Sequence, residues 1–150
     1  MEHIRKATPR DVSRIAEILV FVKRINYRPI FRNDDYSFGE LQVIPVAQEF
    51  LSDPALLAQT FVYDDGIIRG LVQIDGSEVK KLYVDHFFQS QGIGDRLIQF
   101  AVDKYDVRFL YALEKNPRAI AFYERHGFRY LGQWEYEEGT TERLLKLERE

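Results

Sequence analysis

The sequence predicts an α/β (α+β) protein whose central sheet is mixed, mostly antiparallel, built from six to seven strands and flanked by about four helices. Two observations lead to this fold class. Apolar residues recur with helical spacing in segments that open with helix-start residues or with glycine. Between these segments lie β-rich runs, and the turn signals "DDG" and "DGS" separate three of them.

The N-terminal third predicts one short strand, "HIRKA", and two helices. The first helix begins with Thr8 as N-cap, Pro9 at the first helical position and Asp11 three residues after the cap. Its apolar stripe consists of Val12, Ile15, Ile18, Leu19 and Val22. The second helix is predicted around residues 41–52, where Pro45 obscures the start.

The rest of the chain alternates strands with two further helices. Strands are predicted at 60–64, 67–74, 78–84 and 107–113, followed by two closing strands in "FRYLGQWEY" and "TERLLKLER". One helix follows "QSQGIG" and buries Ile93, Leu97, Phe100 and Ala101. The other helix is capped by Asn116, has Pro117 at its first position and ends at Gly127.

The composition is that of one globular domain over residues 1–150, because 45% hydrophobic and 30% charged residues exclude a disordered chain. The net charge of −3 and the lack of a basic run argue against nucleic acid or an anionic membrane as partner. The chain has no cysteine, which excludes disulfides, thiolate metal sites and an acyl-cysteine intermediate. It shows neither a signal segment nor a membrane-spanning run, so a cytoplasmic location is expected.

Two glycines stand where a helix should begin, in "QSQGIG". Gly92 and Gly94 each give up roughly 1 kcal/mol of helix propensity relative to alanine. A strand, a glycine-rich turn and a helix start form a ready anion site, because backbone N–H groups converge there and the helix dipole adds positive potential. The turn lacks the ending of a Walker-type loop and the first glycine of the dinucleotide fingerprint. An ordinary strand–helix turn explains the same residues.

The stretch "NPRAIAFYERHGF" at 116–128 is the second candidate. By itself it predicts a well-capped helix whose Ala119, Ile120 and Phe122 pack inward, with Tyr123 as one more half-buried aromatic side chain. It follows "QSQGIG" along the chain, and each of the two stretches comes directly after a predicted strand.

Together, these two stretches resemble the GNAT acyl-CoA N-acyltransferases. "LYVDHFFQSQGIG" is similar to the family's Q/R-x-x-G-x-G/A acyl-CoA motif, and "NPRAIAFYERHGF" is similar to its N-x-x-A-x-x-F-Y-E-x-x-G-F segment. The predicted element order agrees over nearly the whole chain, and "DDGIIRGLVQI" resembles the second and third family strands. The resemblance implies the GNAT fold, in which the fourth and fifth strands splay apart and admit the pantetheine arm of the acyl-CoA.

The resemblance also implies roles for individual residues. Tyr123 matches the tyrosine that protonates the departing thiolate, and Glu78 matches the glutamate base of the histone-acetylating branch. Asn116 is implied to contact CoA as well as to cap its helix. The other residues implied to bind acyl-CoA are Leu82, Tyr83 and Val84 along the strand, Gln89 at the first motif position, and the main-chain amides of Gln91, Gly92, Ile93, Gly94 and Asp95 around the pyrophosphate.

These roles fit direct attack of an amine on a thioester. A thiol with a pKa of about 8.5 and a tyrosine with a pKa of about 10 can share a proton as the thiolate leaves. A backbone N–H at Val84 would polarise the carbonyl. Glu78 is equally explained as a surface carboxylate beside two lysines, and a base acting through water is an alternative. Tyr111 holds the glutamate position of the ribosomal-protein branch, while His86 and His126 are expected to be structural.

The acceptor site is expected in segment 26–40, which shows no clean period and walls the acceptor in the family. Its residues Tyr27, Phe31 and Tyr36 would shape the pocket. The neighbouring pair Asp34 and Asp35 would attract a cationic amine, although an ordinary packed loop explains the same residues.

The expected function is that of an N-acetyltransferase that moves acetyl from acetyl-CoA, without a metal, to a primary amine in a ternary complex. The acceptor is expected to be a small molecule or a peptide. The protein is compatible with forming a homodimer. The alternative is a non-catalytic module that binds or senses acyl-CoA.

Overall fold

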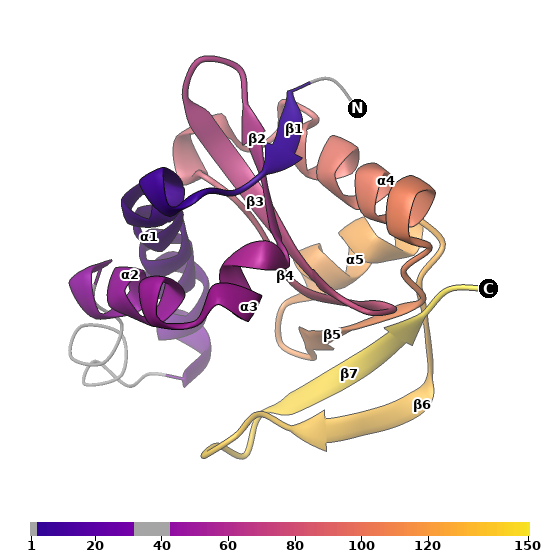
Figure 1. Ribbon diagram of the computed structural model, residues 1–150. Helices are drawn as coiled ribbons and strands as arrows, with labels where there is room; N and C mark the ends of the chain where they lie inside the picture. Colours follow the sequence, from indigo (N-terminus) through magenta and orange to yellow (C-terminus); the bar gives the residue numbers. More distant parts are fainter. Residues whose placement is uncertain (1–2, 32–42) are drawn as a thin grey trace.

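The structure, a computed structural model, describes residues 3–31 and 43–150, with residues 26–31 described by their backbone alone. Over these residues seven strands form one sheet, in the order β1-β2-β3-β4-β5-β7-β6, and five helices flank it (Figure 1). Neighbouring strands pair antiparallel except β4 and β5, which are parallel. The predicted fold class is confirmed.

The bounds of the elements follow the predicted segments closely. The strands are β1 Ile4–Lys6, β2 Thr60–Asp64, β3 Ile68–Asp75, β4 Glu78–Val84, β5 Phe109–Leu113, β6 Arg129–Tyr136 and β7 Arg143–Glu148. The helices are α1 Val12–Phe31, α2 Val43–Ser52, α3 Pro54–Ala58, α4 Ile93–Tyr105 and α5 Pro117–Arg125. Short 3-10 turns at Pro9–Asp11 and His86–Phe88 precede α1 and α4.

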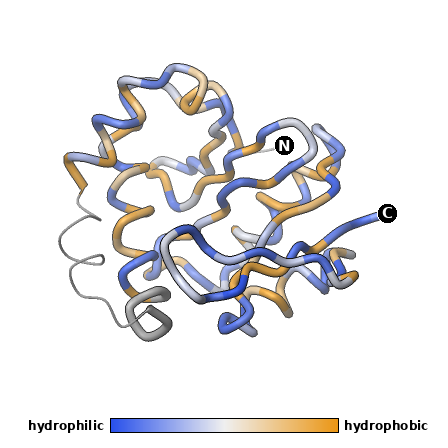
Figure 2. Tube along the Cα trace, turned by 90° about the horizontal axis from the view of Figure 1, so that it is seen from below, coloured by the Kyte–Doolittle hydropathy of each residue, from blue (hydrophilic) through white to orange (hydrophobic). Residues whose placement is uncertain are grey.

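The helices cover both faces of the sheet (Figure 1), and hydrophobic residues alternate with hydrophilic ones along them (Figure 2). Side chains alternate across β3, so that Leu71 joins the cluster under α1 and α2 while Val72 joins the cluster under α4. All residues that the sequence predicted as the apolar stripes of α1 and α4 are buried: Val12, Ile15, Ile18, Leu19, Val22, Ile93, Leu97, Phe100 and Ala101. In the described part of the chain no helix is both long and apolar enough to cross a bilayer.

Two features differ from the predicted pattern. Helix α3 was not predicted, although Asp53 caps it by accepting hydrogen bonds from the N–H groups of Ala55 and Leu56. Helix α1 continues to Phe31, whereas the sequence predicted irregular structure from residue 26. Pro29 lies in its last turn, where the missing N–H removes one hydrogen bond, and the helix ends two residues later.

The fourth and fifth strands separate soon after they meet. In the described sheet β4 pairs with β5 at two positions, Glu78 with Phe109 and Val79 with Leu110. Beyond them β4 stays paired with β3 as far as Val84, while β5 stays paired with β7 as far as Leu113. This geometry confirms the predicted splay.

The splay exposes backbone groups of β4. The N–H of Asp85 donates to the carbonyl oxygen of Arg69 on the β3 side, at 2.8 Å. Because the hydrogen-bonding direction alternates along a strand, the N–H groups of Val84 and Leu82 point the other way, into the splay. The side-chain amide of Gln89 donates to the carbonyl oxygen of Val84 at 3.2 Å, which agrees with this orientation.

Candidate functional site

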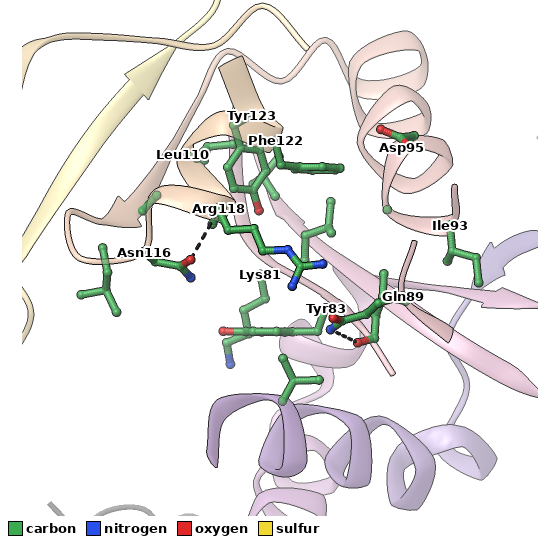
Figure 3. A pocket seen from close by; sticks show the side chains of 18 of the residues that line it. Lys81, Tyr83, Gln89, Ile93, Asp95, Leu110, Asn116, Arg118, Phe122 and Tyr123 are labelled. Carbon is green, nitrogen blue, oxygen red and sulfur yellow. Dashed lines mark hydrogen bonds between the residues drawn. The ribbon is translucent and has the colours of Figure 1, made fainter. Parts of the chain in front are cut away.

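A cavity of about 360 Å³ occupies the splay (Figure 3). Its walls are the diverging strands β4 and β5, the loop that leads into α4, and one side of α5. Tyr123, the predicted general acid, lines it. The lining also includes most of the predicted acyl-CoA contacts: Leu82, Tyr83, Val84, Gln89, Gly92, Ile93, Gly94, Asp95 and Asn116. The structure therefore brings together residues from two motifs that are distant in the sequence.

The two glycines of the turn meet different needs. Gly92 is the N-cap of α4 with φ of +79°, a left-handed conformation that glycine adopts without strain, and a Cβ built on it has no atom within 4 Å. A Cβ on Gly94 would lie 3.3 Å from the ring of Phe122, so any larger residue would have to displace this ring of α5 by a few tenths of an ångström. The open space thus lies at Gly92, where the first amides of a 13-residue helix point outward.

The loop before this turn is tied to α1. The carboxylate of Asp85 accepts from the N–H of Phe87 at 3.0 Å and from the guanidinium of Arg14 at 2.5 Å. Arg14 also donates to the carbonyl oxygen of Ile68 on β3 at 3.0 Å. Burial alone would raise the pKa of Asp85, but these two donors lower it below its ordinary value. The ionised carboxylate therefore holds in place the start of the loop that leads into α4.

Helix α5 presents an amide, a phenol and a cation to the cavity. The side-chain oxygen of Asn116 accepts the N–H of Ala119 at 3.2 Å, which confirms the predicted cap. The ring of Tyr123 packs edge-on against Phe122, with centroids 5.1 Å apart, and its hydroxyl end points into the cavity (Figure 3). The guanidinium of Arg118 extends from the first turn of α5 into the middle of the cavity.

The cavity is cationic although the chain carries a net charge of −3. Among the described lining residues, Lys80, Lys81, Arg118 and Arg125 are basic, and Asp95 is the single carboxylate. The sequence reasoning missed all four basic residues as site residues. The signal for Arg118 was available, because it lies two positions after the helix cap on the turn that Asn116 fixes.

Two predicted site residues are absent from the described lining of the cavity. Glu78 is the first residue of β4, at the end where β4 and β5 are still paired, and it is absent from the described lining of the cavity. Its side chain is 18% exposed, and its carboxylate lies 3.4 Å from the ammonium of Lys80. Gln91 is exposed and also absent from that lining.

The predicted acceptor residues are not tested by the structure. Tyr27 and Phe31 belong to the last turns of α1, whose side chains are outside the described residues, and Tyr36 lies outside them altogether. In the described residues no three His, Cys, Asp or Glu side chains gather as ligands for a metal ion.

Comparisons with known proteins agree with this geometry. A family model described as "Acetyltransferase (GNAT) domain" matches residues 57–130. The chain is 26% identical over 103 residues to peptidyl-lysine N-acetyltransferase YjaB of Salmonella typhimurium, a match that covers 68% of this chain and 70% of that protein. The resemblance to the GNAT family, inferred from the two motifs, is confirmed.

Solved structures share the fold over almost the whole chain. The apo-form of YjaB from Escherichia coli matches with a TM-score of 0.75 at 21% identity, covering 97% of this chain and 95% of that one. The PaiA N-acetyltransferase of Thermoplasma acidophilum, in complex with coenzyme A, matches with a TM-score of 0.67 at 19% identity, covering 97% of both chains.

Proposed function

Because this chain has the GNAT fold and matches the sequence model of that acetyltransferase family over residues 57–130, we propose that it is an acyl-CoA-dependent N-acyltransferase. Acetyl-CoA is the proposed donor and a primary amine the proposed acceptor, with residues 1–150 acting as one domain. The observation that carries the proposal is the cationic cavity in the splay, into which a tyrosine hydroxyl points. A dinucleotide or a nucleoside triphosphate would not need a gap between two strands.

The phosphates of the donor fit the start of α4. The amides from Gln91 to Asp95 begin that helix, and open space lies above Gly92. The helix dipole favours a negative charge there, and the guanidinium of Arg118 adds positive charge to the same cavity. From this point the pantetheine arm would lie along β4 from Val84 to Leu82, where it would pair with the N–H groups that point into the splay.

The chemistry follows from this placement. The neutral amine nitrogen attacks the thioester carbonyl carbon, whose oxygen is polarised by the N–H of Val84. When the tetrahedral intermediate collapses, the C–S bond breaks and the sulfur takes the proton of the Tyr123 hydroxyl. The nitrogen loses a proton to the base, and Tyr123 regains one from solvent. The products are an amide and free CoA thiol.

The base is proposed to be Glu78, either directly or through water. Its carboxylate begins β4, the strand along which the donor would lie, and is held near the Lys80 ammonium. Since Glu78 lies at the paired end of the splay, a bridging water would carry the proton from the amine to the carboxylate.

A panel of primary amines and lysine peptides, incubated with acetyl-CoA while thiol release is measured, tests this proposal. Lysine peptides are included because the relative in Salmonella typhimurium is named a peptidyl-lysine N-acetyltransferase. Release that depends on an amine supports the proposal. Tight binding of CoA with no release for any amine would instead identify a binding module.

A further inference from the structure

The side chain of Lys81 belongs to the wall of the cavity. Tyr83 lies opposite Leu71, a member of the cluster under α1 and α2, and Lys81 lies opposite Gln73 on the same face of the sheet. Both Lys81 and Tyr83 line the cavity, and Figure 3 shows them at the end that faces α1. An amine of this chain therefore lies in the cavity in which acyl transfer is proposed.

The Lys81 ammonium lies against an aromatic ring. The side chain is half-buried, and the ammonium lies 5.8 Å from the ring centroid of Phe50 on α2. Among the described residues, none forms an ion pair or a hydrogen bond with it. Burial lowers the pKa of Lys81, an effect that Glu49 of α2 opposes and Lys80 increases. A larger fraction of Lys81 than of an ordinary lysine is therefore the neutral amine, the form that attacks a carbonyl.

The neighbouring lysine has different surroundings. Lys80 also lines the cavity, but its side chain is exposed and its ammonium lies 3.4 Å from the carboxylate of Glu78. Lys80 is therefore a comparison for Lys81 that lies in the same cavity and in the same peptide.

The proposed donor would approach Lys81 from the start of α4. Its pantetheine arm would lie along β4 from Val84 to Leu82, and Lys81 is the next residue of the strand in that direction. The hydroxyl end of Tyr123 points into the same cavity (Figure 3). An amine and the proposed general acid thus line one cavity before any acceptor has bound.

We infer that Lys81 is an internal acceptor, so that the protein acetylates its own Lys81 when no other amine is present. The inference rests on the proposed function and adds a modification site to it. The neutral Nζ attacks the thioester carbonyl carbon, the C–S bond breaks, and the sulfur takes the proton of the Tyr123 hydroxyl. The nitrogen then loses a proton, which returns to Tyr123 through water. The products are acetyl-lysine at position 81 and free CoA thiol.

Incubation of the whole protein with acetyl-CoA, without an acceptor, tests the inference. Thiol release is measured, and the modified lysines are located by peptide mass spectrometry with fragmentation. Release should stop after one molar equivalent per chain. Lys81 should be acetylated at least about tenfold faster than Lys80 or the exposed Lys104 of α4, because only Lys81 is positioned for attack. The rate constant should not depend on protein concentration, since the reaction occurs within one chain.

Three variants assign the reaction to the cavity. Lys81→Arg keeps the charge but removes the amine, and it should abolish the acceptor-free release of thiol. Lys104→Arg, the matched change in the last turn of α4, should leave that release unchanged. Tyr123→Phe should slow the acetylation of Lys81 by roughly 10² or more, as expected for the loss of a general acid, without changing the slow background at Lys104.

The outcomes separate this inference from the proposed function. If Lys81 is acetylated no faster than Lys80 and Lys104 while an amine from the panel still releases thiol, the inference is wrong and the acyltransferase stands. The same preference for Lys81 with acetyl phosphate, a donor without CoA, would also overturn it, because Lys81 would then be reactive without a bound donor. If no amine of the panel releases thiol, one equivalent released by acetylation of Lys81 still supports the internal acceptor, and its absence overturns it.

Discussion

The imidazole Nε2 of His126 lies 2.7 Å from the carboxylate Oδ1 of Asp95. The contact joins the C-terminal end of α5 to the first turn of α4, at the carboxylate that lines the otherwise cationic cavity. An imidazole that donates its Nε2 proton to Asp95 would reduce the repulsion that this carboxylate would exert on the phosphates of the proposed donor. The sequence predicted a structural role for His126 at a helix end, and the contact with Asp95 leads us to propose this electrostatic role in addition.

The contact between His126 and Asp95 predicts that a second substitution, at Asp95, restores the CoA affinity lost by substituting His126. His126→Phe keeps the ring that packs 5.1 Å from Phe122 but removes the partner of Asp95. CoA affinity should fall about two- to fivefold at low salt, as for a partly exposed charge pair, and less at high salt because ions screen the charge. Asp95→Asn in the same background should restore it. Calorimetric titration at two salt concentrations measures this, and a double variant as weak as His126→Phe would assign the effect to packing.

Substitution of Gly92 is expected to weaken CoA binding while the protein stays folded. Gly92→Asn and Gly92→Val both place a Cβ in the open space above the turn, but asparagine tolerates the left-handed conformation better. If a phosphate fills that space, both variants should bind CoA about tenfold more weakly, equivalent to about 1.4 kcal/mol. The Asn variant should keep nearly the parent's melting temperature. If a folded Asn variant binds CoA with unchanged affinity, "QSQGIG" is an ordinary strand–helix turn and not a phosphate-binding site.

Removal of the Tyr123 hydroxyl is expected to lower kcat without weakening the binding of acetyl-CoA. Tyr123→Phe keeps the ring packed against Phe122 and Phe128, so stability should change little. General acid catalysis is worth roughly 10²–10⁴ in rate, and its removal should lower kcat while the affinity for acetyl-CoA stays the same. Steady-state kinetics on an amine from the panel, with CoA affinity measured in parallel, checks this. A kcat within about twofold of the parent, where chemistry limits turnover, would exclude Tyr123 as the acid.

Glu78 predicts an effect that depends on pH. If Glu78 is the base, Glu78→Gln should lower kcat/KM most at low pH, where the amine is hardest to deprotonate, and leave CoA affinity unchanged. Asp75→Asn, which changes the residue paired with Glu78 on β3, is the matched control. If the pH–rate profile of the variant superimposes on that of the parent, Glu78 is not the general base and its role is limited to the ion pair with Lys80.

Local signals in the sequence account for most of the fold. The capping residues Thr8 and Asn116, the turn glycines and the apolar stripes each act within a few residues, so the elements they define can be predicted from the chain. The same logic would have found α3, because Asp53 and Pro54 repeat the arrangement of Asn116 and Pro117. The extension of α1 past Pro29 could not be predicted from local signals, since a proline normally argues against helix.

The site was less accessible from the sequence, because part of it depends on which side chains meet across the splay. Acyl-CoA contacts were predicted through their motif positions. The cationic lining was not, since Arg118 and Lys81 are ordinary charged residues until α5 and β4 face each other. Lys81 on β4 and Arg118 on α5 line the same cavity although they lie 37 positions apart in the sequence, and no short-range pattern predicts that they face one cavity.

The short pairing of β4 with β5 divides the described sheet into two parts that few backbone hydrogen bonds connect. One half is the hairpin stack β1–β4 under α1 and α2, and the other is β5–β7; in the described sheet two register pairs join their backbones. A ligand lying between the strands would brace the halves and make their opening cooperative. Hydrogen exchange should then slow on β5 and on β7, a strand beyond the cavity wall, when CoA is added. Slowing confined to β4 and α4 would mean that the halves open independently even when the ligand is bound.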